Sequence, residues 1–174
     1  PRMLADLTGD GRADIVGFGD FGVFVSLNNG DGTFGPVTQV VDNFAHEAGG
    51  WRVTKHPRML ADLTGDGRAD IVGFGDFGVF ASLNNGDGTF GSVTQVSDNF
   101  AHEAGGWRVM KHPRTLADLT GDGRADILGF GDFATFVSLN NGDGTFGPVT
   151  QVVDNFAYET GGWRVTKHPR TVVG

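Results

Sequence analysis

The sequence predicts an all-β fold, a β-propeller built of four-stranded antiparallel blades. The first observation is an internal repeat: the segment PRML at residues 1–4 returns at 57–60, and close variants begin at 113 and 169. The second is that each copy holds four short runs rich in apolar and β-branched residues, with no helical apolar period. A repeat of this length lies in the range of propeller blades.

The expected strands of the first copy are Arg2 to Leu7, Ala13 to Phe18, Gly22 to Leu27 and Val37 to Phe44. Between them lie the turn sequences TGDG, GDFG and NNGDG, whose residues tolerate positive φ. In an up-and-down meander the first and third of these connections share one end of the blade. The second turn and the linker to the next blade share the other. Two rims of different chemistry are therefore expected.

We divide the chain into blade 1 (1–56), blade 2 (57–112), blade 3 (113–168) and the start of a further repeat (169–174). Propellers close with about 4–8 blades, so three blades do not make a ring. We expect a homo-oligomer, with a six-bladed dimer favoured, or a piece of a longer propeller. In a dimer, residues 169–174 would duplicate the first strand of the neighbouring copy.

Composition excludes several classes of protein. The chain has 30 Gly, far above the usual share of roughly 7%, and no Cys, which excludes disulfides, thiolate metal sites and thiol catalysis. Its net charge of −8 argues against nucleic acid. No apolar run approaches the ~20 residues that span a bilayer, and no signal peptide is visible, so we expect a soluble protein, cytoplasmic or secreted. No nucleophile, base and orienting residue occur together, and we expect no enzyme.

The loop DLTGDGRAD places oxygen donors at positions 1, 3, 5 and 9 with Gly at 6, close to a calcium loop. It departs from that pattern by Thr at position 3 and by lacking a Glu at position 12. Side-chain caps of a tight turn are the alternative, and NNGDG is expected to be a turn only. The expected structural calcium ligands, with the carbonyl oxygen of each Arg, are Asp6, Thr8, Asp10, Arg12, Asp14, Asp62, Thr64, Asp66, Arg68, Asp70, Asp118, Thr120, Asp122, Arg124 and Asp126.

The linker at 46–56 holds the only Trp of the first copy, and the linkers together hold every His of the chain. An aromatic ring beside Arg, His and glycine-exposed backbone is typical of a sugar site. The alternative is that Trp packs between blades as core while His bonds a buried carbonyl. Zinc is not favoured, since the third copy has Tyr in place of the first His and no pair has ligand spacing. The linker residues expected to bind sugar are His46, Gly50, Trp51, Arg52, His56, His102, Gly106, Trp107, Arg108, His112, Tyr158, Gly162, Trp163, Arg164 and His168.

The string DLTGDGRADIVGFG followed by SLNNGDGTFGPV resembles the FG-GAP/VCBS repeat of integrin-type propellers. The string DNFAHEAGGWRVTKHPR resembles the blades of the fungal propeller lectins of the Psathyrella velutina lectin type, over all three copies. This resemblance implies a multivalent lectin that binds N-acetylglucosamine, and sialic acid through its acetamido group, between adjacent blades, with calcium in the loops. The alternative is a calcium-stabilised adhesion or scaffold propeller with a protein partner; ordinary FG-GAP blades do not need the Trp-Arg-His linker.

We expect the second turn of the next blade to close each pocket. The linker of blade 1 would face Asp76 and Phe77 of the next blade, and that of blade 2 would face Asp132 and Phe133. The linker of blade 3 would need a partner for its far wall, and the turn at that position of the repeat is Asp20 and Phe21.

Overall fold

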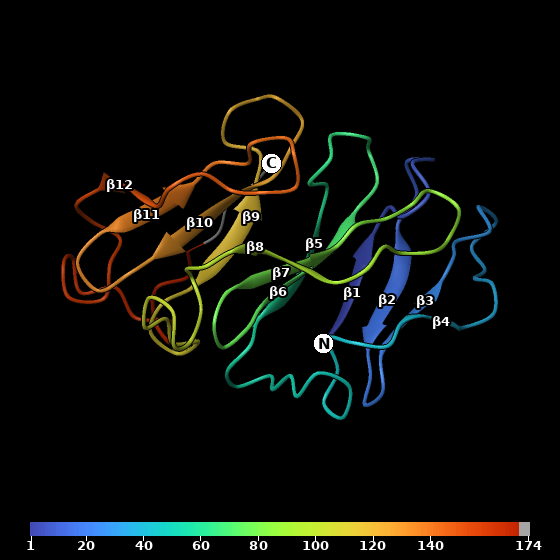
Figure 1. The fold of residues 1–174 in the computed structure, drawn as a ribbon, viewed down its shortest axis with the longest axis horizontal. Helices are drawn as coiled ribbons and strands as arrows, with labels where there is room; N and C mark the ends of the chain where they lie inside the picture. The colour runs from blue at the N-terminus through green and yellow to red at the C-terminus, as the bar shows by residue number, and fades with distance from the viewer. Residues whose placement is uncertain (171–174) are drawn as a thin grey trace.

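The computed structural model describes residues 1–170, which fold into twelve β-strands with no helix. The strands form three four-stranded sheets, one in each copy of the repeat, lying side by side (Figure 1). Blade 1 contains β1 (Arg2–Ala5), β2 (Asp14–Phe18), β3 (Val23–Ser26) and β4 (Thr38–Val41). Blade 2 contains β5 (Arg58–Ala61), β6 (Asp70–Phe74), β7 (Val79–Ser82) and β8 (Thr94–Ser97). Blade 3 contains β9 (Arg114–Ala117), β10 (Asp126–Phe130), β11 (Thr135–Ser138) and β12 (Thr150–Val153).

Within each sheet the strands are antiparallel and follow chain order. In blade 1, Arg2 lies opposite Gly17 and Ile15 lies opposite Ser26. The register shifts once, at the pairing with β4, between Val23 and Phe24. The predicted all-β fold of four-stranded antiparallel blades is confirmed. The strands are shorter than the expected runs, because residues at the ends of those runs belong to hydrogen-bonded loops. The predictions made for residues 171–174 lie outside the described residues.

The hydrophobic core lies between the sheets. Val16, Phe44 and Trp51 of blade 1 are buried together with Ile71 of blade 2. A second core repeats this arrangement in the next copy, between blades 2 and 3. The first strands of the blades, β1, β5 and β9, lie next to one another, so the sheets share an inner edge. Each blade therefore gains its core by stacking on a neighbour, as repeat units do.

A second set of contacts joins the blades near the turns of the acidic loops. The side-chain amide of Asn84 donates to the carbonyl oxygen of Leu7 in blade 1 at 2.9 Å and to that of Ala69 in its own blade at 3.2 Å. The backbone N–H of Ala69 donates to the carbonyl oxygen of Asp6 at 2.8 Å. The same bonds recur one copy later, between blades 2 and 3. The first Asn of NNGDG, expected only to shape a turn, thus also joins neighbouring blades.

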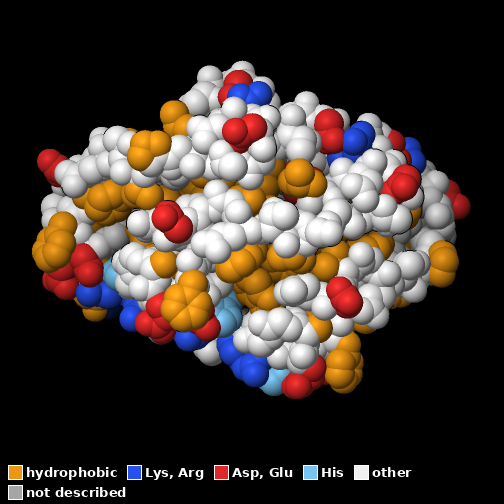
Figure 2. All heavy atoms as spheres, in the orientation of Figure 1, with side chains coloured by type: hydrophobic (Ala, Val, Ile, Leu, Met, Phe, Trp, Pro, Cys, Tyr) orange, Lys and Arg blue, Asp and Glu red, His pale blue; other side chains and the backbone are white. Residues whose placement is uncertain are grey.

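The two ends of a blade carry different connections, as the meander predicts. At one end, which we call the acidic rim, Asn28 of the NNGDG turn donates to the carbonyl oxygen of Ala13 in the TGDGRAD loop at 3.1 Å. At the other, the linker rim, the N–H of Glu47 donates to the carbonyl oxygen of Asp20 at 2.7 Å. Charged and His side chains gather along the lower edge of Figure 2, where the linkers lie, and hydrophobic side chains form bands between the sheets. Residues 1–170 contain no helix able to cross a membrane.

Candidate functional site

Two cavities open on the linker rim, one between each pair of neighbouring blades. The first has a volume of about 490 Å³ and the second of about 410 Å³. The two sets of lining residues correspond one to one across the repeat. The first set is Asn43, Gly49, Gly50, Trp51, His56, Gly75, Asp76, Phe77, Phe80 and Val93. The second set is Asn99, Gly105, Gly106, Trp107, His112, Gly131, Asp132, Phe133, Phe136 and Val149.

Trp51 forms the floor of the first cavity and also belongs to the core between blades. Its ring lies 4.9 Å from that of Phe44 and 6.2 Å from that of Phe80, measured between centroids. It rests on β6 at Gly73, where an added Cβ would lie only 2.5 Å from the indole ring. The alternative that Trp packs between blades is therefore confirmed, and the same ring still lines the cavity.

Asn43 fixes the position of this tryptophan, and nothing in the sequence marked it as a site residue. Its Oδ1 accepts the indole N–H of Trp51 at 2.9 Å and the backbone N–H of Phe44 at 2.6 Å. Phe44 is buried and has a φ of 54°, a left-handed conformation rare for a residue with a bulky side chain. Because both bonds fall on Oδ1, the Nδ2 amide of Asn43 is the group left to donate to a ligand. The only signal was that DNF recurs in each copy.

His56 and Asp76 form the polar wall of the cavity, and Lys55 supports this wall through its ion pair with Asp76. Nδ1 of His56 accepts the N–H of Arg52 at 3.1 Å, so Nε2 carries the proton and donates to Oδ1 of Asp76 at 3.0 Å. Nζ of Lys55 also binds Oδ1 of Asp76. His56 thus bonds a carboxylate of the next blade and not the buried carbonyl considered above. Oδ2 of Asp76, for which the described residues supply no hydrogen bond, can accept one from a ligand.

Protonation states follow from these contacts. The Lys55 ammonium, and after it His56, hold the pKa of Asp76 below its ordinary value, so this carboxylate is charged at neutral pH. Burial lowers the pKa of His56, which keeps its ring neutral and its Nδ1 able to accept. The pKa of Lys55 is raised by its bond to Asp76. The wall therefore presents one oriented carboxylate to the cavity.

The second cavity repeats this wall, and the third linker does not. Nε2 of His112 lies 3.0 Å from Oδ1 of Asp132, whereas His168 of the third linker is exposed. No blade faces the third linker within residues 1–170, so Trp163 is only partly buried. Asp20 and Phe21 of the first blade are exposed, and no linker of a preceding blade covers them within the described residues. Within residues 1–170 the third linker therefore has no far wall.

The structure does not bring every expected linker residue into the cavities. Nη1 of Arg52 donates to the carbonyl oxygens of His46 and Trp51, at 2.8 and 3.2 Å. His46 lies on the surface with its Nδ1 against Glu47. Arg108 and Arg164 make the same bonds within their own linkers, with the carbonyl oxygens of His102 and Tyr158. In the described structure these Arg side chains brace the linker and line neither of the two cavities.

One cluster in residues 1–170 has three side chains close enough to share a metal ion: Asp76, His102 and Glu103. Its positive charge is already supplied by Lys55, whose Nζ binds Asp76 and lies 3.7 Å from Oε1 of Glu103. In the third copy Tyr158 replaces the histidine and its ring lies 4.4 Å from Nζ of Lys111. The cluster is thus an ion-pair network beside the cavity.

The acidic loops use their carboxylates to hold the turn. Asp6 accepts backbone N–H groups from Thr8, Gly9 and Gly11 at 2.7–3.0 Å. The two oxygens of buried Asp14 accept N–H groups of Leu7 and Asn28.

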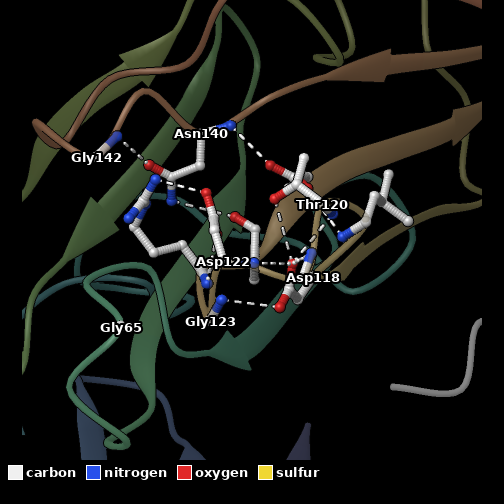
Figure 3. A network of polar contacts seen from close by, with 12 residues as sticks. Gly65, Asp118, Thr120, Asp122, Gly123, Asn140 and Gly142 are labelled. Carbon is white, nitrogen blue, oxygen red and sulfur yellow. Dashed lines mark hydrogen bonds and ion pairs between the residues drawn. The ribbon is translucent and has the colours of Figure 1, made fainter.

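Figure 3 shows the third copy of the acidic loop. There Asp118 accepts the N–H of Gly123 at 2.9 Å, and Asn140 accepts that of Gly142. The turn-capping alternative is therefore present in the structure. A calcium ion at these oxygens would compete with backbone donors.

Comparison with known proteins agrees with the repeat. A family profile for FG-GAP-like repeats matches residues 6–72 and 62–129. The chain belongs to the FG-GAP-like repeat family. No curated protein gave a significant match.

This FG-GAP-like chain is also similar to a solved Agrocybe aegerita lectin, whose structure is described as explaining specific recognition of non-reducing terminal N-acetylglucosamine. The two chains share 55% identity with a TM-score of 0.93, over 99% of this chain and 42% of that one. This chain therefore spans less than half of the lectin's length. The named relative is a lectin from Agrocybe; the resemblance to the Psathyrella type stays a prediction.

The FG-GAP-like fold is shared more widely. A Photorhabdus luminescens Tc holotoxin pore matches at 25% identity and a TM-score of 0.67, over 89% of this chain and 7% of that one. The TcdB2-TccC3 complex matches at 23% identity and a TM-score of 0.56, over 73% of this chain and 6% of that one. At these identities the likeness concerns the fold.

Proposed function

We propose that this protein is a multivalent, non-catalytic lectin that binds terminal N-acetylglucosamine in the cavities between its blades. The observation that carries the proposal is the cavity itself: an aromatic floor and one oriented carboxylate, built by two blades and repeated between the next two. The 55% identity to a lectin of that specificity supports it.

The cavity suits a single sugar residue with an acetamido group. Its volume lies in the range of small-ligand sites. Trp51, Phe77 and Phe80 provide apolar surface for the C–H face of a sugar ring or an acetyl methyl group. The Nδ2 amide of Asn43 can donate to an acetamido carbonyl, and Oδ2 of Asp76 can accept from a hydroxyl or N–H.

Two glycines open the backbone at this point. Gly49 and Gly50 have φ values of +93° and +72°. A Cβ at Gly49 would collide with Asn43 and Trp51, whereas a Cβ at Gly50 would meet no atom within 4 Å. The backbone at Gly50 is therefore open to a ligand.

Among N-acetylated sugars we propose N-acetylglucosamine first and sialic acid second. Both carry the acetamido group. Sialic acid also brings a carboxylate, which the charged Asp76 would repel unless Lys55 offsets it. Several sites on one rigid rim raise avidity for a surface that displays many such residues.

Retention on immobilised N-acetylglucosamine tests the proposal. We expect the protein to be retained, to elute with free N-acetylglucosamine, and to pass through mannose and galactose matrices. A sialylated matrix measures the second sugar. If none of the four matrices retains the protein, the lectin proposal is wrong, and a scaffold propeller with a protein partner takes its place.

Calcium binding by the acidic loops is a separate proposal, supported by the spacing of their oxygen donors. The loops lack one charge at position 3, and weak sites of the extracellular kind have Kd values of about 10⁻⁴–10⁻³ M. At ten times its Kd, calcium would stabilise the protein by about 1.4 kcal/mol for each loop. We expect the Tm to rise with 10 mM calcium and to return with EDTA, with magnesium as the control. A Tm that calcium leaves unchanged would show that these carboxylates only cap turns.

A further inference from the structure

We propose that the acidic rim carries a second kind of binding site, which takes a small organic cation with an apolar body, such as a quaternary ammonium, between blades 1 and 2. This site lies at the opposite end of the blades from the sugar cavities and does not depend on them. Apolar side chains, one aromatic ring and one carboxylate line the same cavity there.

The cavity has a volume of about 270 Å³, little more than half that of the first sugar cavity. Blade 1 contributes residues of its acidic loop and of the β3 region, and blade 2 contributes its NNGDG turn. The lining residues are Leu7, Thr8, Val25, Leu27, Asn84, Gly86, Asp87, Gly88 and Phe90. A cavity just below the usual volume of drug-sized ligand sites suits a molecule of few heavy atoms.

Four of the lining side chains are apolar. Leu7 and Val25 are buried, whereas Leu27 is 37% exposed. Phe90 is half-buried and packs against the core between the two blades. The aliphatic side chains can cover the methyl groups of a ligand, and an aromatic ring attracts a cation that lies over its face.

Asp87 supplies the charge at this cavity. Its Oδ1 accepts the hydroxyl of Thr89 at 2.6 Å and the N–H of the same residue at 3.0 Å. The hydroxyl, and after it the N–H, hold the pKa of Asp87 below its ordinary value, so the carboxylate is charged at neutral pH. Within residues 1–170 its Oδ2 has no hydrogen bond and no basic side chain forms an ion pair with it. The carboxylate is therefore fixed in place and available to a cation.

The charges beside the cavity also favour a cation. Arg68 lies next to Gly86, where an added Cβ would meet its guanidinium carbon at 2.9 Å, but it is paired with Asp66 at 2.5 Å. Asp6, whose Oδ1 accepts the N–H of Thr8 at 3.0 Å, adds another carboxylate. Together with the carboxylate of the NNGDG turn, three carboxylates stand against one guanidinium.

The whole rim has the same balance. Its three acidic loops and three NNGDG turns hold twelve Asp and three Arg, so the rim is more negative than the whole chain with its net charge of −8. A concentration of charge of one sign raises the local concentration of ions of the other sign. Small cations are therefore drawn to this end of the blades.

The lining suits an organic cation better than a metal ion. Calcium needs about six to eight oxygen ligands. The side-chain oxygens of the lining belong to Asp87, Thr8 and Asn84, and that of Asn84 already accepts the N–H of Gly86 at 2.9 Å. A quaternary ammonium needs no hydrogen bond, because a carboxylate and an aromatic ring hold it by its charge and apolar walls cover its methyl groups.

Methyl NMR in the presence of EDTA tests the site, because Val25 and Leu27 report from its walls. The probe is choline, raised to about 50 mM since a ligand of so few heavy atoms binds weakly. We expect the methyl signals of Val25 and Leu27 to shift until they saturate. The signals of Val53, which is exposed on the linker rim, should not move. Dimethylbutanol, the uncharged analogue with carbon in place of the ammonium nitrogen, should bind roughly fivefold more weakly.

Two substitutions separate the charge from the ring. Asp87→Asn keeps an oxygen for the Thr89 bonds and should weaken choline binding roughly two- to fivefold. Phe90→Leu keeps an apolar side chain and should weaken it by roughly the same factor. Asp31→Asn is the matched control, since Asp31 accepts the same two bonds from Thr33 but does not line this cavity. It should leave the choline titration of Val25 and Leu27 unchanged.

Three results would overturn the proposal. The first is a choline titration in which the Val25 and Leu27 signals do not move, which would mean that no cation binds at this cavity. The second is binding of dimethylbutanol as tight as that of choline, which would mean that the cavity does not select a charge. The third is wild-type affinity for choline in either Asp87→Asn or Phe90→Leu, which would mean that the replaced group takes no part in recognition.

Discussion

Replacing Asp76 by Asn is expected to remove one N-acetylglucosamine site per chain. Asn keeps an oxygen to accept the His56 proton but loses the charge that Lys55 and His56 orient. A hydrogen bond to a charged group contributes about 1.5–3 kcal/mol, which corresponds to a roughly 10- to 100-fold weaker Kd at that cavity. Calorimetric titration with N-acetylglucosamine would show the stoichiometry fall by one.

The repeat supplies matched controls for this experiment. Asp132→Asn should remove one site in the same way, and the double variant should remove two. Asp98→Asn changes an exposed carboxylate that lines neither cavity and should bind as the wild type does. If Asp76→Asn retains full stoichiometry and affinity, Asp76 does not contact the sugar.

Replacing Trp51 by Ala is expected to lower the free energy of unfolding by roughly 3–5 kcal/mol, the usual cost of removing a large buried aromatic side chain. The indole ring fills the space above Gly73. Its removal leaves that space empty and takes the indole N–H donor away from Oδ1 of Asn43. Urea denaturation, followed by circular dichroism, measures the loss.

Trp163→Ala is the comparison. Trp163 keeps the same neighbours in its own blade, including Phe156 at 5.0 Å between ring centroids, but no second blade covers it within the described chain. Trp163→Ala should lower the free energy of unfolding much less than Trp51→Ala does. Equal losses would mean that the contact with the next blade contributes little to stability.

The sequence was sufficient for the fold because the repeat and its turns are local signals. The period of the repeat set the number of sheets, and the Gly, Asn and Asp turns placed the four strands of each. The assignment of loops to two rims followed from meander connectivity. The predicted strands were too long: the first was expected to reach Leu7, but β1 ends at Ala5. The side chain of Asp6 accepts backbone N–H groups of the following residues and holds them in a loop.

The site could be predicted only in part. Trp51, His56, Asp76 and Phe77 do lie together at one cavity. Arg52 lies elsewhere, because a long side chain can turn back to carbonyl oxygens of its own linker, which spacing does not reveal.

Two further residues of the site escaped the sequence. Asn43 depends on the left-handed conformation of the following Phe, which no pattern of residue types encodes. Lys55 depends on a carboxylate from another blade.

Each contact between blades joins Trp51 of one unit to Gly73 of the next, and Trp107 and Gly129 form the identical pair at the following junction. An in-frame duplication of one unit would therefore insert a blade whose two faces already fit their neighbours, and would add one binding cavity at the same time. The same arrangement restricts sequence divergence, because a bulkier residue in place of Gly73 or Gly129 obstructs the tryptophan of the unit before it. Gain of valency is thus a single genetic step, whereas divergence between copies is held back at every junction.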